Sequence, residues 1–169
     1  MLENIAVDED NQNYQAIDGL LFDEDIKTVL ACPSRRSGFV ELPDQVYNIG
    51  AYAFYNCDKI TGLKTSEQSQ IEEIREYAFC NCSSLLSIIL PDSIKIIGSY
   101  AFSGCSNAEN LVIGEGVETI GYGVFKDCTK LNQVYYNAVS CADCLSDVST
   151  RLVFRNCSSL VSLTVGKSV

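Results

Sequence analysis

The sequence repeats itself at intervals of roughly two dozen residues, and this repeat constrains the fold more than any other feature. In every copy a phenylalanine is followed three positions later by a cysteine. The phenylalanines are Phe54, Phe79, Phe102, Phe125 and Phe154, with spacings of 25, 23, 23 and 29 residues. A period of this length is typical of a solenoid, in which each coil buries its apolar face only against neighbouring coils.

Other apolar columns appear when each copy is counted from its phenylalanine. The column nine residues later contains Leu63, Ile88, Leu111, Val134 and Leu163, and the column eleven residues later contains Thr65, Leu90, Ile113, Tyr136 and Val165. Their alternation with intervening residues predicts a short strand with one buried face. The phenylalanine and cysteine, three apart, are expected to share one face of a single helical turn. Each coil is therefore predicted to hold a strand, a turn, a second short extended piece and a helical turn.

One segment carries a family resemblance. Residues Leu85 to Cys105 match, almost position for position, the pattern Leu-x-x-Ile-x-Leu-Pro-x-Ser-Ile-x-x-Ile-Gly-x-Tyr-Ala-Phe-x-x-Cys. This resembles the signature of BspA-type leucine-rich repeats. The resemblance implies an α/β leucine-rich-repeat solenoid, right-handed and curved, β-rich, with short parallel strands and short helical turns. The segment 13–33 is similar to the longer hairpin variant of the same family.

The resemblance also implies how the chain is organised. We expect one solenoid over residues 1–169, with a long hairpin-containing repeat at 1–45. Standard repeats of about 23 residues follow at 46–169, with an insertion at 137–150. The pattern departs from the signature at 66–70 as well. Both ends lie within the repeat register, since Leu2, Ile5 and Val7 occupy repeat columns. We therefore expect the chain to be a fragment of a longer repeat protein.

The charge balance narrows the choice of partners. Twelve lysines and arginines stand against twenty-two aspartates and glutamates, a net charge of −10. Such a surface repels phosphate backbones and anionic lipids, so neither nucleic acid nor an anionic membrane is expected as a partner. No apolar run approaches the length of a membrane span, and no membrane insertion is expected of this fragment.

Catalytic and metal-binding patterns are missing from the sequence. The chain contains no histidine, which excludes His-based triads and zinc sites that need histidine. The acidic runs at 8–10 and 23–25 could in principle ligate calcium, but neither has EF-hand spacing, so solvated turns are favoured. No glycine-rich phosphate loop and no nucleophile beside a base is visible. We expect a protein that is not an enzyme and that holds no cofactor and no metal.

Nine cysteines invite a disulfide interpretation. Five of them form the repeat column: Cys57, Cys82, Cys105, Cys128 and Cys157. Stacked coils would direct their Cβ atoms in parallel rather than toward one another, so buried free thiols are expected. The isolated Cys-Ala-Asp-Cys at 141–144 lacks the context of a redox or zinc motif. A local disulfide or plain loop cysteines are favoured there.

Three outward positions on neighbouring strands are large and apolar: Ile89, Val112 and Tyr135. Ordinary β-propensity would account for them, and a protein-binding stripe would account for them equally well. The first function expected is a non-catalytic interaction or adhesion module, since the resemblance implies a cell-surface or secreted protein. Its partner would be a protein, such as a host extracellular-matrix or other cell-surface protein. The alternatives are a rigid spacer in a larger surface protein and an intracellular interaction protein.

Overall fold

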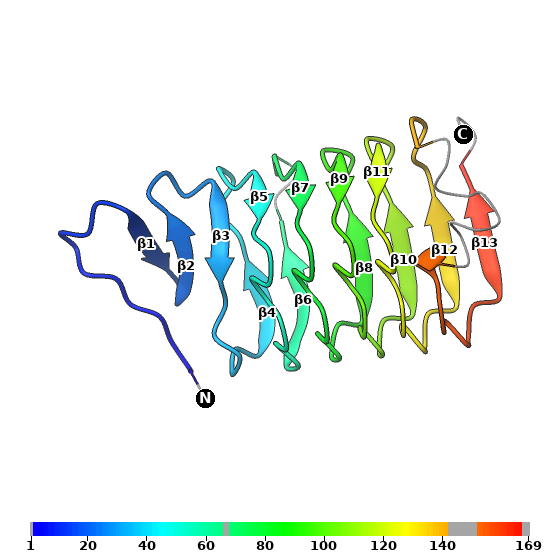
Figure 1. The fold of residues 1–169 in the computed structure, drawn as a ribbon, viewed down its shortest axis with the longest axis horizontal. Coiled ribbons are helices and arrows are strands. Elements are labelled where there is room, and N and C mark those ends of the chain that lie inside the picture. The colour runs from blue at the N-terminus through cyan, green and yellow to red at the C-terminus, as the bar shows by residue number, and fades with distance from the viewer. Residues whose placement is uncertain (1, 66–67, 142–151, 167–169) are drawn as a thin grey trace.

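The chain forms a β-solenoid in the computed structural model, which describes residues 2–65, 68–141 and 152–166. Figure 1 shows the strands side by side along the long axis, from the N-terminal end to the C-terminal end. Each standard coil contributes one short strand to a seven-stranded sheet and one longer strand to the opposite side of the stack. The stacked-repeat fold expected from the sequence is therefore confirmed.

Three sheets contain all the described strands. The seven-stranded sheet consists, in spatial order, of β1 (Tyr14–Ile17), β2 (Leu20–Asp23), β3 (Thr28–Ala31), β5 (Asn48–Ile49), β7 (Glu73–Ile74), β9 (Ile96–Ile97) and β11 (Thr119–Ile120). The four-stranded sheet consists of β8 (Ser87–Leu90), β10 (Asn110–Ile113), β12 (Gln133–Tyr136) and β13 (Ser162–Val165). The two-stranded sheet consists of β4 (Gly38–Glu41) and β6 (Ile60–Lys64). The pairs β1–β2 and β2–β3 are antiparallel, and the other pairs are parallel.

The four-stranded sheet follows the repeat register. Val112 lies opposite Ile89 of β8 and opposite Tyr135 of β12. In β8 and β12 buried residues alternate with less buried ones, which is the period of a strand with one face on a core. The core face carries the columns predicted to be buried, among them Leu111 and Ile113, which are fully buried.

The helical turns expected at the phenylalanines are not confirmed. In the described part of the chain these segments are turns, and only residues 152–153 are helical. Tyr100 has a φ of 58° and Asn81 a φ of 61°, and the equivalent residues of other coils share this left-handed conformation. Alternate backbone N–H groups donate to the next coil, as Phe79 does to Ala101 at 2.7 Å. A right-handed helix cannot continue through left-handed residues, so the segment pairs between coils.

Phenylalanine and cysteine columns fill the core. Consecutive phenylalanine rings are stacked with centroids 4.7, 5.1, 5.7 and 5.5 Å apart. The thiol of Cys105 donates to the carbonyl of Phe79 at 3.3 Å, and that of Cys128 to Phe102 at the same distance. All five cysteines of the column are free, and four are buried. The expectation of free thiols is confirmed, and each small apolar side chain also provides a hydrogen-bond donor. Cys141 is disulfide-bonded, and Cys144 of the predicted Cys-Ala-Asp-Cys segment lies outside the described residues.

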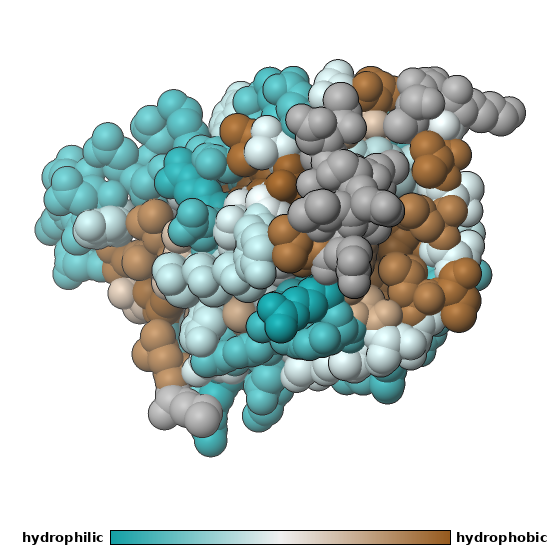
Figure 2. All heavy atoms as spheres, turned by 45° about the vertical axis from the view of Figure 1, so that its right-hand side comes forward, coloured by the Kyte–Doolittle hydropathy of each residue, from teal (hydrophilic) through white to brown (hydrophobic). Residues whose placement is uncertain are grey.

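The last described strand departs from the expected burial. Leu163 and Val165 belong to columns predicted to face the core, yet they are 42% and 46% exposed. Strand β13 pairs with β12 on one side and with no described strand on the other. Burial in a solenoid requires a coil on each side, so an end coil exposes its apolar columns. Figure 2 shows apolar side chains gathered at this end, where Val161 is 85% exposed.

Candidate protein-binding surface

The structure places the three predicted site residues in one row. Ile89, Val112 and Tyr135 are direct cross-strand neighbours on β8, β10 and β12. Ile89 is 70% exposed, Tyr135 is 42% exposed and Val112 is half-buried. At about 4.8 Å per strand the row is roughly 10 Å long. We call these three residues the apolar stripe.

Polar residues border the apolar stripe on its own sheet. Two positions before each stripe residue stand Ser87, Asn110 and Gln133. In the next strand of the sheet, Thr164 pairs with Tyr135 and ends the row. An apolar centre with a polar border is the composition of many protein interfaces.

A cleft lies at the other end of the apolar stripe. Strands β6 and β8 come from consecutive coils but are not hydrogen-bonded neighbours in any sheet. Between them is a space of about 300 Å³, lined by Thr61, Leu63, Leu85, Ile88 and Ile89, and reaching core residues that include Ile74 and Phe102. Phe39 and Leu86, which are 58% and 59% exposed, also line it. This cleft was not predicted from the sequence. Two sequence features could have indicated it. The spacing between Phe54 and Phe79 is 25 residues instead of 23, and the sequence departs from the repeat signature at 66–70.

A row of tyrosines, exposed at its two ends and half-buried between them, lies on the turns. The rings of Tyr52 and Tyr77 are stacked at 5.0 Å, and those of Tyr77 and Tyr100 at 5.1 Å. Tyr122 continues the row edge-on at 5.3 Å from Tyr100. Each stacked ring covers the face of the next one, so the row offers mainly ring edges and hydroxyl groups to solvent. The apolar stripe remains the more suitable surface for an apolar contact.

Three buried thiols of the cysteine column, those of Cys82, Cys105 and Cys128, do not resemble catalytic nucleophiles. Burial raises the pKa of the Cys82 and Cys105 thiols, which keeps both protonated near neutral pH. The pKa of Cys128 is also raised, first by a hydrogen bond with Cys157 and then by burial. A nucleophilic cysteine requires the opposite shift and access to solvent.

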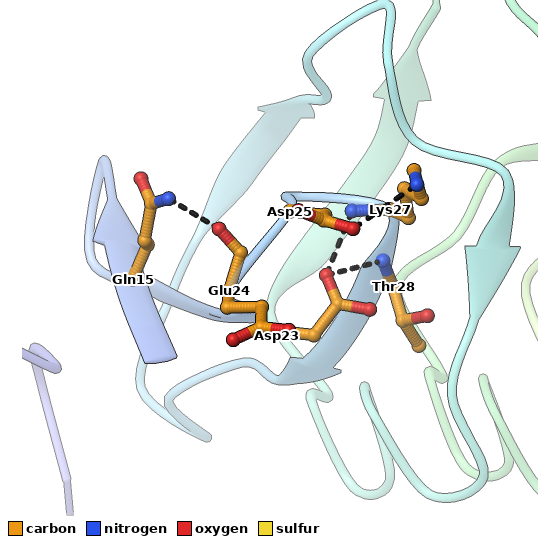
Figure 3. A network of polar contacts seen from close by, with 6 residues as sticks. All are labelled: Gln15, Asp23, Glu24, Asp25, Lys27 and Thr28. Carbon is orange, nitrogen blue, oxygen red and sulfur yellow. Dashed lines mark hydrogen bonds and ion pairs between the residues drawn. The ribbon is translucent and has the colours of Figure 1, made fainter. Parts of the chain in front are cut away.

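The acidic residues 23–25 lie at the end of β2 and in the turn that leads to β3 (Figure 3). The Asp23 carboxylate accepts the backbone N–H groups of Lys27 at 2.7 Å and Thr28 at 3.0 Å. Asp25 forms an ion pair with the Lys27 ammonium at 3.0 Å and raises the pKa of that lysine. Over the described residues, no group of three or more side chains is arranged to hold a metal ion. The Asp23 and Asp25 carboxylates order the turn through these contacts.

The geometry defines a repeat protein of the β-solenoid class with an apolar stripe on its four-stranded sheet. The chain belongs to the BspA-type leucine-rich-repeat family. The model for the BspA type leucine rich repeat region matches residues 34–160 in six copies. The resemblance seen in the sequence is therefore confirmed. No protein with a curated description matches the chain.

Solved structures of other proteins share the fold. A leucine-rich repeat protein from Eubacterium ventriosum is 22% identical with a TM-score of 0.77, and the match covers 96% of this chain and 42% of that one. A leucine rich cell surface protein from Faecalibacterium prausnitzii is 23% identical with a TM-score of 0.78, covering 93% and 40%. A T. pallidum leucine rich repeat protein is 25% identical with a TM-score of 0.64, covering 95% and 82%. The chain thus spans about two-fifths of the length of the first two proteins.

Across residues 2–65, 68–141 and 152–166, no helix combines the length and the apolar character that crossing a bilayer requires.

Proposed function

We propose that this solenoid is a non-catalytic protein-binding module, and that the four-stranded sheet with its apolar stripe is the contact surface. The observation that carries the proposal is the alignment of three large apolar side chains, Ile89, Val112 and Tyr135, in register on neighbouring strands. Rigid parallel strands hold these side chains in place before binding. A partner would therefore meet a preorganised surface and lose little free energy in ordering it.

The partner we propose is a protein exposed outside the cell, such as an extracellular-matrix or other cell-surface protein. One structural neighbour is described as a cell surface protein, which supports this compartment. The net charge of −10 favours a partner whose contact surface is basic, because opposite charge speeds association.

The proposal can be tested by placing a charge in the apolar stripe. Purified laminin, collagen and fibronectin are immobilised in turn, and binding of the wild-type chain is measured by surface plasmon resonance. For any of them that binds, Val112→Lys and Ile89→Lys should weaken the complex by about tenfold or more, since a charge would be desolvated at the contact. The matched control is Ile96→Lys. Ile96 is an exposed isoleucine of the same coil but lies on β9 in the other sheet.

The result can also favour a different function. If Val112→Lys and Ile89→Lys bind as tightly as the wild type while Ile96→Lys does not, the contact surface is the other sheet. If none of the variants changes binding, or nothing binds, a rigid spacer becomes the better account. Regular stacking of the coils suits a spacer, because backbone hydrogen bonds between the turns join consecutive coils in the part of the chain that the structure describes.

A further inference from the structure

The cleft between β6 and β8 is a break in an otherwise regular ladder. The N–H of Glu109 donates to the carbonyl of Leu86 at 3.0 Å, whereas the equivalent bond one coil earlier, from Leu86 to Thr61, is 3.4 Å long. At the far end of the strands, Asn137 donates to Ile113 at 3.0 Å. The equivalent residue after β8 is Pro91, which has no N–H to donate. Pro91 therefore cannot form a bond of this kind to β6.

The break leaves two strand edges facing each other. Strand β8 ends the four-stranded sheet, and β6 ends the two-stranded sheet. A strand edge of this kind is a template for an extended peptide, whose backbone pairs with it while its side chains enter pockets. The cleft lies at this edge and has a volume of about 300 Å³. Cavities of about half that size hold one benzene ring, so a phenylalanine or leucine side chain fits.

The surroundings of the cleft indicate what accompanies that side chain. A neighbouring pocket of about 540 Å³ shares Leu63 and Ile89 with the cleft and is also lined by Glu41, Asp44 and Lys64. The Lys64 ammonium lies 5.5 Å from the centre of the Phe39 ring, on one side of the cleft. Two carboxylates against one ammonium give this pocket a negative balance. A basic residue next to the apolar one would complement it.

We propose that the cleft between β6 and β8 takes a bulky apolar side chain from an extended, basic segment of the protein partner. The inference rests on the proposed function, because the apolar stripe begins at Ile89, which also lines the cleft. The cleft and the stripe then form one continuous surface. A buried apolar anchor beside a flatter contact is how many interfaces obtain most of their affinity.

A defined peptide tests the cleft without any natural partner. The ¹⁵N-labelled chain is titrated with acetyl-Lys-Thr-Phe-Thr-Lys-amide and, separately, with the same peptide carrying alanine in place of phenylalanine. The phenylalanine peptide should shift the amide signals of Thr61, Leu63 and Ile89. The alanine peptide should bind about tenfold more weakly or worse, because it lacks the side chain that would be buried. Equal binding of the two peptides, or shifts confined to other strands, would overturn the proposal.

Two variants at equivalent positions of the repeat locate the binding. Leu86→Lys places a charge at the cleft, and Val161→Lys places one at the same column three coils later, where the residue is also exposed. Only Leu86→Lys should lose binding of the phenylalanine peptide, by about tenfold. An equal loss in both variants would show that general charge repulsion is responsible, and would contradict the inference.

Two further measurements exclude other occupants. Indole alone, titrated in the same way, should bind much more weakly than the peptide, and binding of equal strength would make the cleft a small-molecule pocket. Sedimentation should show no dimer that Leu86→Lys disrupts, since such a dimer would mean that a second copy occupies the cleft.

The outcome separates this inference from the proposed function. Peptide binding in the cleft without binding to laminin, collagen or fibronectin would reject only the proposed partners. Stripe-dependent binding to one of those proteins, without peptide binding, would reject only the cleft.

Discussion

At the scale of single residues, the turns contain tyrosines in a conformation that tyrosine ordinarily avoids. Tyr52, Tyr77 and Tyr100 have φ values of 60°, 57° and 58°, and the equivalent residue of the next coil is Gly123, with a φ of 61°. A residue with a Cβ loses about 1 kcal/mol or more in the left-handed region. Stacking of the tyrosine rings offsets this cost, at about 0.5–1.5 kcal/mol for each pair.

We predict that Tyr100→Gly destabilises the chain less than Tyr100→Ala, by about 1 kcal/mol. Both substitutions remove the ring and its stacking on Tyr77, so the difference isolates the backbone conformation. Urea unfolding of the two variants measures it. In the helical turn expected from the sequence the order would be reversed, because alanine is about 1 kcal/mol better than glycine in a helix. A more stable alanine variant would therefore contradict the turn geometry.

At the scale of elements, the strands were predicted well and the turns were not. The alternation predicted from the apolar residues nine and eleven positions after each phenylalanine is found in β8, β10 and β12. It could be predicted because a period of two is specific to strands. A spacing of three, as between Phe102 and Cys105, is shared by a helical turn and by the observed turn. The sequence pattern could not separate these two conformations. The left-handed residues that decide between them include tyrosine, which gives no sequence signal for that conformation.

The candidate site was predicted in part for a similar reason. The outward positions of Ile89, Val112 and Tyr135 follow from period two alone. The cleft depends on whether two coils pair, which is a relation between segments more than twenty residues apart. Pro91, whose nitrogen cannot donate to a ladder, is a further feature beside the 25-residue spacing of Phe54 and Phe79 and the departure from the repeat signature at 66–70.

The stacking of whole coils leads to a second prediction. Phe102 is 3% exposed and lies between Phe79 and Phe125, whereas Phe154 is 9% exposed and stacks only on Phe125 among the described residues. Phe102→Ala should lower the free energy of unfolding by about 3–5 kcal/mol, because it leaves a cavity between two coils. Phe154→Ala should cost less. Thermal and urea unfolding of both variants measure the difference, and equal losses would argue against a core built by coil-on-coil contact.

At the scale of the whole molecule, stacking separates structural residues from those available for binding. The inward columns hold the coils together, and the outward residues of the four-stranded sheet lie at the surface or are half-buried. Among the outward residues the apolar stripe is the departure from a polar surface, and the cleft adjoins it. The charge of −10 acts over the entire surface and affects the rate of association more than the choice of contact residues.

Hydroxyl-radical footprinting tests the proposed contact surface most directly. Tyr135 on the four-stranded sheet and Tyr122 on the turns are each 42% exposed, so they serve as matched probes in one chain. The oxidation of both is measured by mass spectrometry, with and without a matrix protein that binds. The account predicts that the complex protects Tyr135 and leaves Tyr122 as reactive as in the free chain. Protection of Tyr122 with unchanged reactivity of Tyr135 would place the partner on the turns and contradict the account.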